Sequence, residues 1–448
     1  MLLLLTPCGA TEPHEPVRAE GGETPAEPAL APEPVVAERE VAEEPPPPPD
    51  PALTVRLPRV HSRLTPEVVA RLREIVAAGN RSENVFAKMG GSSIESRAFL
   101  HCLAHDRNVD LGGRDELQAT LEFFREGNVP GGNSFGRGSI AARKGWSVRH
   151  GLTGRPSRVI QEVQAISPRY ALVFFGGNDV QGRNPMHFGE RLEQLIESVV
   201  PRGVVPILGA TTPRGDDADM DLWARKFNRV SHGIARAWGF PYIDFYLALE
   251  ELPNRGLAGD GVHSNVLRDG GRSRACVFTE EGLERGMNMR NLRTLEGLHR
   301  VRQAMAGDAP DPSPETPYGL GTADEPLRLP SVPWAERLDV AGLGTSLASY
   351  ACGDEEPVER PGPERVYRIR VDEPRALWVG AIARRGSVGV YLLDEELGCV
   401  SGGGDEIEVE LQRGVHHVAV ELGPDRDDAT LTVMFDTAVA PAAEDAAP

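Results

Sequence analysis

A carboxylate and an imidazole stand three residues apart at Asp260-x-x-His263, the only Asp-x-x-His in the sequence. In an acyl-transfer triad, a histidine takes the proton of the nucleophile while a carboxylate fixes the histidine tautomer and stabilises the imidazolium. A spacing of three lets both side chains point from one tight turn toward a common point. Glu296-x-x-His299 has the same spacing, but it lies in an amphipathic stretch where a solvated helix face is the favoured interpretation.

Ser92 and Ser93 are the candidate nucleophiles, and they follow two glycines after the apolar run 85–89. Glycine permits the sharp strand-to-helix turn that exposes a serine hydroxyl. The N-terminus of the helix expected after this turn favours an oxyanion. The alternative is a plain helix cap, a position that serine commonly takes.

Two further residues are candidate donors to an oxyanion. Asn178, in Gly-Gly-Asn-Asp at the end of a predicted strand, has a side-chain amide, and Gly145 has a backbone N–H. The alternatives are an Asn-Asp turn and an ordinary glycine turn. Cysteine and histidine show no metal-ligand spacing, and the glycines around Ser92 lack the lysine of a phosphate-binding loop. We therefore expect no metal and no cofactor.

Alternating strands and helices must position these residues. Thr65 and Pro66 are typical of a helix start, and helices are predicted from there to Gly79, from Ser93 to Leu103, and over 157–166, 187–200, 219–238 and 279–305. Apolar strands are predicted over 85–89, 171–175, 204–208 and 242–245. This alternation indicates an α/β fold whose parallel sheet is covered on both faces, with a ligand crevice at the carboxyl ends of the strands.

The order of the blocks resembles that of the SGNH (GDSL) hydrolase superfamily: serine, glycine, asparagine, then Asp-x-x-His. The resemblance covers about residues 80–305. It implies a three-layer α/β/α, flavodoxin-like fold and a serine esterase whose triad is Ser92, His263 and Asp260. It also implies an oxyanion hole built from the serine N–H, Gly145 and Asn178.

The first block departs from the family pattern, because Gly91 stands where Gly-Asp-Ser has its aspartate. A register shifted by one residue would make Ser93 the nucleophile. Ser92 is favoured, since the strand then reaches the turn without an extra residue. The expected reaction proceeds through an acyl-enzyme on an ester of an acetylated glycan or a lipid, or on a thioester. The alternative is a catalytically silent surface-binding protein that retains the fold.

Six short alternating stretches near the C-terminus predict a small antiparallel β-sandwich, over 366–371, 376–380, 388–393, 407–411, 416–420 and 431–433. Their order resembles the bacterial pre-peptidase C-terminal domain, an accessory module of secreted enzymes. His416 and His417 do not suggest a metal site, because adjacent strand residues point to opposite faces.

The N-terminal segment suggests export. Residues 1–10 contain four leucines and Cys8 and resemble the end of a lipoprotein signal, although no basic region precedes the leucines and Pro7 departs from the pattern. Residues 11–52 are predicted to be a disordered spacer rich in Pro and Glu. Five cysteines include two pairs that suit disulfides in an oxidising compartment, suspected as Cys102–Cys276 and Cys352–Cys399, with buried thiols as the alternative.

Composition sets the remaining bounds. A net charge of −19 argues against nucleic-acid binding, and the sequence has no apolar run long enough to span a membrane. We expect a small-molecule, glycan or lipid ester as substrate and a membrane tether through the N-terminal lipid. Three arginines after His263 suit an anionic substrate, although a solvated loop is the simpler interpretation: Arg268, Arg272 and Arg274. The expected domains are a hydrolase over 53–306, a linker over 307–348, a sandwich over 349–437 and a disordered tail over 438–448.

Overall fold

The computed structural model describes residues 50–341, 343–347, 349–353, 356–359, 361–423 and 430–439. The predicted signal at 1–10 with Cys8, the predicted spacer up to residue 49 and the tail from residue 440 lie outside these residues. No helix among the described residues is long and apolar enough to cross a membrane.

A four-stranded parallel sheet forms the centre of the first half of the chain. Its order is β2 (Ser82–Gly90), β3 (Pro168–Phe174), β4 (Val205–Gly209) and β5 (Tyr242–Ile243). The central strands β3 and β4 are almost entirely buried. They are continuous apolar runs because helices cover both faces of a parallel sheet.

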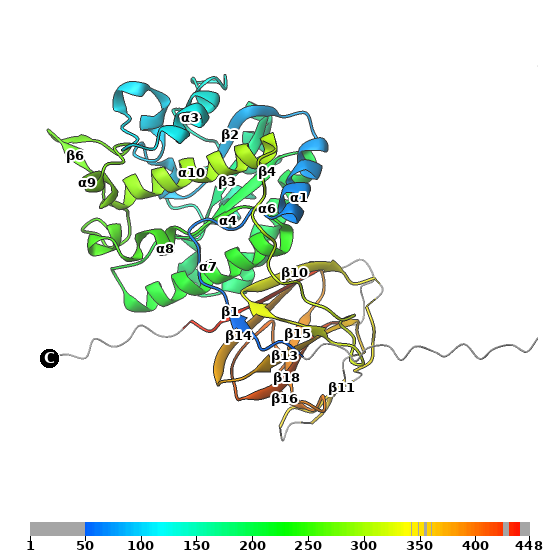
Figure 1. Ribbon diagram of the computed structural model, residues 1–448. Coiled ribbons are helices and arrows are strands. Elements are labelled where there is room, and N and C mark those ends of the chain that lie inside the picture. Colours follow the sequence, from blue (N-terminus) through cyan, green and yellow to red (C-terminus); the bar gives the residue numbers. More distant parts are fainter. Residues whose placement is uncertain are drawn as a thin grey trace, which may run out of the picture. The chain divides into compact units, whose positions relative to one another are not determined.

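The helices form a layer on each side of this sheet (Figure 1). α1 (Pro66–Ala77) and α10 (Gly286–Ala306) pack together on one face. On the other face α5 (Arg158–Ile166), α6 (Pro185–Val199) and α7 (Ala218–Trp238) lie side by side. The predicted α/β fold with a parallel sheet is therefore confirmed.

Local signals set where several of these helices begin. Thr65 caps α1 by accepting the N–H of Val68, with Pro66 as the first helical residue, as predicted. Asp244 caps α8 (Phe245–Glu250) by accepting the N–H of Leu247. Because this cap starts a helix, β5 stops at Ile243, short of the strand predicted over 242–245.

The helix predicted from Ser93 to Leu103 is wrong. The structure has the four-residue α2 (Ser92–Glu95) and then a 3-10 turn, His101–Ala104. Leu100 takes a left-handed backbone conformation, and its N–H donates to the side chain of Asn291 on α10. A tertiary hydrogen bond thus replaces the helical one. A further helix, α3 (Gln118–Arg125), was not predicted from the sequence and packs on β2 and α10.

The C-terminal part contains two antiparallel sheets around their own apolar core, and the predicted β-sandwich is confirmed. One sheet has the order β10 (Trp334–Asp339), β19, β14 and β17, and the other has the order β16 (Cys399–Gly402), β15, β18, β13 and β8 (Leu327–Arg328). All six predicted stretches are strands: β13 (Glu364–Val371), β14 (Arg375–Ala383), β15 (Val388–Leu393), β17 (Glu406–Leu411), β18 (Gly414–Leu422) and β19 (Thr430–Thr437).

The segment expected as a linker over 307–348 contains three strands: β8 (Leu327–Arg328), β9 (Ser331–Val332) and β10 (Trp334–Asp339). β10 pairs with β19 along its length and β8 with β13. The start of the expected hydrolase domain also contacts these strands, because β1 (Thr54–Val55) pairs with β9. These segments are short and rich in Pro and Gly, so the alternation that marks a strand is weak in them.

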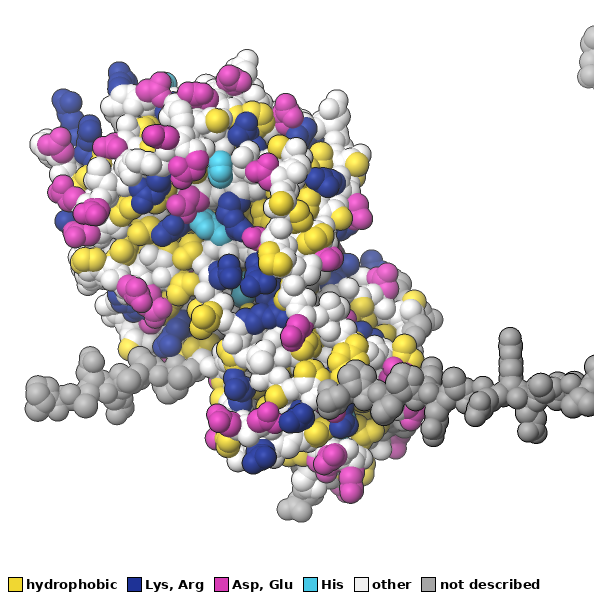
Figure 2. All heavy atoms as spheres, in the orientation of Figure 1, with side chains coloured by type: hydrophobic (Ala, Val, Ile, Leu, Met, Phe, Trp, Pro, Cys, Tyr) yellow, Lys and Arg dark blue, Asp and Glu magenta, His cyan; other side chains and the backbone are white. Residues whose placement is uncertain are grey.

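Two disulfides join the cysteine pairs suspected from the sequence. Cys102 bonds to Cys276 and Cys352 bonds to Cys399, where the second cysteine lies on β16 (Cys399–Gly402). Acidic and basic side chains are interspersed over the α/β part on the face that Figure 2 shows. Among the described residues no group of three or more His, Cys, Asp or Glu side chains is arranged to hold a metal ion.

Candidate active site

The structure brings the three predicted triad residues together at the carboxyl end of the sheet. Ser92 follows β2 as the first residue of α2, and its Oγ lies 3.0 Å from Nε2 of His263. Nδ1 of the same ring lies 2.7 Å from Oδ2 of Asp260. A neutral imidazole in this position accepts the serine proton at Nε2 while its Nδ1–H donates to the carboxylate.

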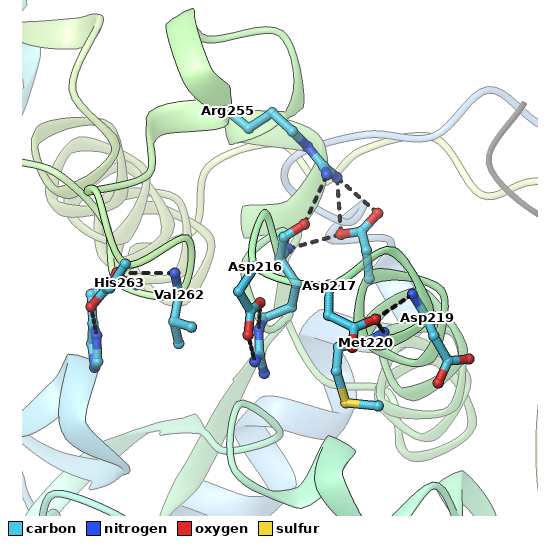
Figure 3. A network of polar contacts seen from close by, with 10 residues as sticks. Asp216, Asp217, Asp219, Met220, Arg255, Val262 and His263 are labelled. Atoms are coloured by element: carbon cyan, nitrogen blue, oxygen red, sulfur yellow. Dashed lines mark hydrogen bonds and ion pairs between the residues drawn. The ribbon is translucent and has the colours of Figure 1, made fainter. Parts of the chain in front are cut away.

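The turn from Asp260 to His263 holds its own carboxylate in place. Oδ1 of Asp260 accepts the backbone N–H groups of Val262 and His263 (Figure 3). These backbone bonds and the ring N–H lower the pKa of Asp260 to about 2. The carboxylate therefore stays ionised at neutral pH, as the partner of an imidazolium must.

Neighbouring loops support this turn. Gly261 has φ +66° and its carbonyl accepts the N–H of Gly215 in the connection between β4 and α7. Figure 3 shows the start of α7 with Asp216 near the turn that carries His263. Asn265 then joins the turn to α10, since its side chain accepts the N–H of Gly286.

Ser93 also lines the pocket in front of His263, but the hydrogen bond to the ring comes from Ser92. The rival pair, Glu296 and His299, lies within α10 and away from both serines. His299 contacts Thr120 through Nδ1, and Glu296 accepts from Arg293.

The two predicted oxyanion donors, Gly145 and Asn178, lie in the same pocket as Ser92. Nδ2 of Asn178 donates to the carbonyl of Trp146 at 3.0 Å, which fixes the amide and leaves its second hydrogen. Among the described residues no acceptor is found for the backbone N–H of Ser92 or of Gly145. Ser92, Gly145 and Asn178, the three candidate donors, thus line one pocket. α2 has only four residues, so it contributes little of a helix dipole at this site.

Asp179, which sequence reasoning did not single out, ties the two donor loops together. Its carboxylate accepts the N–H of Gly176 on its own loop and of Val148 on the loop of Gly145. Burial raises the pKa of Asp179 to about 6, although these N–H groups oppose the shift. In the sequence, only the position of Asp179 next to Asn178 pointed to this role.

The pocket in front of Ser92 has a volume of about 170 Å³. Trp146 and Phe175 form apolar parts of the pocket wall. Arg214, in the connection between β4 and α7, and Arg290, on α10, also line the pocket. None of the three arginines considered for an anionic substrate lines this pocket: Arg268 and Arg272 lie in an exposed hairpin, and Arg274 directly follows it.

Part of this chain matches a known protein family. Residues 127–267 match the GDSL-like lipase/acylhydrolase family, a segment that includes Gly145, Asn178, Asp260 and His263 but not Ser92. A search of curated proteins found no match. No family was identified for the β-sandwich.

Solved structures with similarity to this chain include a lipase and two esterases. A GDSL-like lipase from Bacteroides thetaiotaomicron is 14% identical, with a TM-score of 0.31, and the match covers 52% of this chain and 98% of that one. A two-domain esterase active on acetylated mannans is 11% identical, with a TM-score of 0.30, covering 84% of this chain and 96% of that one. An acetylxylan esterase from Geobacillus stearothermophilus is 17% identical, with a TM-score of 0.32, covering 48% and 95%.

The family match and the parallel α/β fold agree with the order of the sequence blocks. Residues 127–267 of this chain are therefore similar to a GDSL-like lipase/acylhydrolase domain.

Proposed function

We propose that this protein is a serine ester hydrolase that removes a short acyl group through an acyl-enzyme on Ser92. The observation that carries the proposal is the chain of contacts from Ser92 Oγ to His263 Nε2 and from His263 Nδ1 to Asp260 Oδ2. A serine hydroxyl is a weak nucleophile until a base within hydrogen-bond reach takes its proton.

In the first half of the reaction, Ser92 Oγ attacks the ester carbonyl and its proton passes to Nε2 of His263. The N–H groups of Ser92 and Gly145 and the amide of Asn178 stabilise the oxyanion. The imidazolium then gives its proton to the leaving alcohol. In the second half, water attacks the acyl-enzyme by the same route and frees Ser92.

The size of the pocket supports a short acyl group. Its volume of about 170 Å³ is below the roughly 300 Å³ at which pockets for drug-sized ligands begin. An acetyl group fits this space, whereas the alcohol part, glycan or lipid, would lie at the open mouth. We expect the rate on 4-nitrophenyl esters to fall as the acyl chain grows from acetyl to octanoyl.

The test compares hydrolysis of 4-nitrophenyl acetate by the full chain with that of Ser92→Ala, Ser93→Ala and His263→Ala. We expect losses in kcat of about 10³-fold or more for the Ser92 and His263 variants, as for other triads. Ser93→Ala is the matched control and should retain activity. Equal activity of wild type and His263→Ala, with neither serine labelled by a fluorophosphonate, would mean a binding protein with this fold.

We further propose that the protein functions outside the cytosol, tethered through Cys8. The two disulfides support export, since such bonds persist in oxidising compartments. Metabolic labelling with a radioactive fatty acid should mark the wild type and not Cys8→Ser. Equal labelling of both would exclude the tether.

A further inference from the structure

Arg290 has a place in the pocket that the proposed reaction does not use. It lies in the first turns of α10 and is 3% exposed, yet it lines the same pocket as Ser92 and His263. Its guanidinium stacks over the rings of Phe99 and Phe245, at 5.6 and 5.1 Å from their centroids. Both rings contact Phe174, the last residue of β3 and itself part of the pocket wall.

The guanidinium of Arg290 has no polar partner among the described residues. Its Nε and Nη1 are buried without a hydrogen bond, and burial lowers its pKa to about 10 with no carboxylate nearby to oppose the shift. Other buried arginines differ in this respect: Arg229 and Arg236 both have Asp436 facing them. Arg290 is therefore a buried cation whose countercharge is not supplied by the described part of the chain.

The rest of the pocket wall leaves this charge uncompensated. Its described lining includes Lys144, Arg214 and Arg290 but no aspartate or glutamate. Arg214 is already paired, since its Nε and Nη2 donate to the two oxygens of Asp216 at 2.8 and 2.5 Å. Among the cations that line the pocket, only Arg290 combines deep burial with guanidinium nitrogens that have no hydrogen-bond partner among the described residues.

Removing a cation from water without a partner destabilises a fold, so an unpaired buried guanidinium points to a ligand that completes it. A guanidinium matches the two oxygens of a carboxylate, sulfate or phosphate in a bidentate pair. Resting on the proposed ester hydrolysis, we infer that Arg290 binds an anionic group of the substrate, so that the preferred substrate is an ester carrying a carboxylate, sulfate or phosphate close to the scissile bond. The pocket, and not the exposed hairpin at 268–273, would then determine this preference.

The experiment measures kcat/KM for two matched pairs of esters. One pair puts the charge in the acyl part, mono-4-nitrophenyl succinate against 4-nitrophenyl acetate. The other puts it in the alcohol part, 4-acetoxybenzoate against 4-acetoxybenzamide. Wild type should prefer the anionic member of at least one pair by tenfold or more, and the pair that responds identifies the side of the ester that carries the charge.

Arg290→Met should lower that anionic-to-neutral ratio by tenfold or more. The matched control is Arg302→Met, a half-buried arginine of the same helix that also stacks on a phenylalanine, Phe123, but hydrogen-bonds to Thr120 and lies outside the pocket lining. It should leave the ratio unchanged. No preference in either pair, or an equal ratio in wild type and Arg290→Met, would overturn the inference.

Anion binding gives a second readout that does not depend on hydrolysis. Succinate or sulfate, against sodium chloride at equal ionic strength, should raise the Tm of wild type and of Arg302→Met but not that of Arg290→Met. If no ester is cleaved in a Ser92-dependent way, the proposed function fails while this measurement still decides whether Arg290 binds an anion. Equal shifts in all three proteins would refute the anion site.

Discussion

At the scale of single residues, Gly91 shows how the side chain of Asn178 limits which residue can precede Ser92. An added Cβ at this position would lie 2.8 Å from Nδ2 of Asn178 and 3.0 Å from the carbonyl of Trp146. These two atoms are hydrogen-bonded to each other, so neither can move alone. Glycine, which stands here in place of the usual aspartate, is thus the residue that fits against Asn178 in this arrangement.

Gly91→Ala should therefore lower kcat on 4-nitrophenyl acetate by about tenfold, equivalent to roughly 1.4 kcal/mol of transition-state stabilisation. The physical reason is displacement of the Asn178 amide from the oxyanion. Gly138→Ala is the control, because nothing lies within 4 Å of a Cβ there. Wild-type kcat in Gly91→Ala would contradict the role given to Asn178.

Asp179 allows a prediction about stability and pH. Its pKa is about 6 in the folded protein against 3.8 for the free group, so the folded state binds the proton more tightly than the unfolded state. Its contribution to the free energy of unfolding therefore falls as the pH rises from about 4 to 6, by on the order of 3 kcal/mol. Asp179→Asn cannot ionise and should lack this slope.

The measurement is denaturant unfolding of both proteins at several pH values between 4 and 7. The stability of wild type relative to Asp179→Asn should decline over this window and then level off. A difference that stays constant with pH would show that Asp179 is not a buried carboxyl with a raised pKa.

Residue types and spacing predicted part of this site. Asp260 and His263 are close in sequence and recognisable, and the glycine turn before Ser92 marked the candidate nucleophile. The burial of Arg290 could not be predicted from the sequence, because an arginine inside an amphipathic helix is normally solvated. Only the packing of Phe99 and Phe245 around it, from segments far apart in the sequence, makes it buried.

At the scale of elements, the turn that carries His263 depends on close packing against the connection between β4 and α7. Gly261 is in the left-handed region at φ +66°, and an added Cβ would lie 2.6 Å from the backbone N of Asp216. Both the conformation and the contact require glycine. The turn therefore packs against backbone atoms, which cannot move aside to make room for a Cβ as a flexible side chain could.

Gly261→Ala should lower both the Tm and kcat, since the turn must shift and take the ring of His263 with it. A loss of stability of about 1–3 kcal/mol is expected for strain of this kind. Gly259→Ala, two residues earlier and with open space around its Cβ, is the control. Thermal unfolding and acetate-ester kinetics on the three proteins check the prediction, and a fully active Gly261→Ala would contradict it.

Long periodic segments were predictable at this scale, and short ones were not. The helices α5, α6 and α7 and the strands of the parallel sheet follow their apolar patterns. The segment after Ser92 has a helical pattern, but the side chain of Asn291 accepts the N–H of Leu100 and donates to the carbonyl of Ala98, which gives the segment an irregular course. Contacts with a helix nearly 200 residues later in the chain cannot be seen in a local pattern.

At the scale of the whole molecule, the apolar core of the α/β part continues into the sandwich. Trp378, Ile382 and Met434 belong to the same buried cluster as the helices α6 and α7. Two glycines permit close approach, because a Cβ at Gly189 would lie 2.6 Å from Ile382 and one at Gly233 2.6 Å from Met434. The sandwich therefore completes the core of the α/β part and is more than an appended module.

A buried carboxylate at this boundary is hydrogen-bonded to both parts. Glu193 on α6 accepts hydrogen bonds from Trp238 of α7 at 2.9 Å and from the hydroxyl of Thr432 on β19 at 2.6 Å. Burial raises the pKa of Glu193, and the hydrogen bonds from Trp238 and Thr432 oppose this shift because they stabilise the carboxylate. Thr432→Val keeps the shape of the side chain and removes one of these two donors.

We therefore expect Thr432→Val to lose about 1–3 kcal/mol of stability, the usual effect of an unsatisfied buried polar group. Because the core is shared, esterase activity and the far-UV circular dichroism of the sandwich should be lost in one transition, at a lower temperature in the variant than in wild type. Thr345→Val, at an exposed loop position, is the control. Two separate transitions, with the catalytic part unmoved by Thr432→Val, would mean that the two parts fold independently despite the shared core.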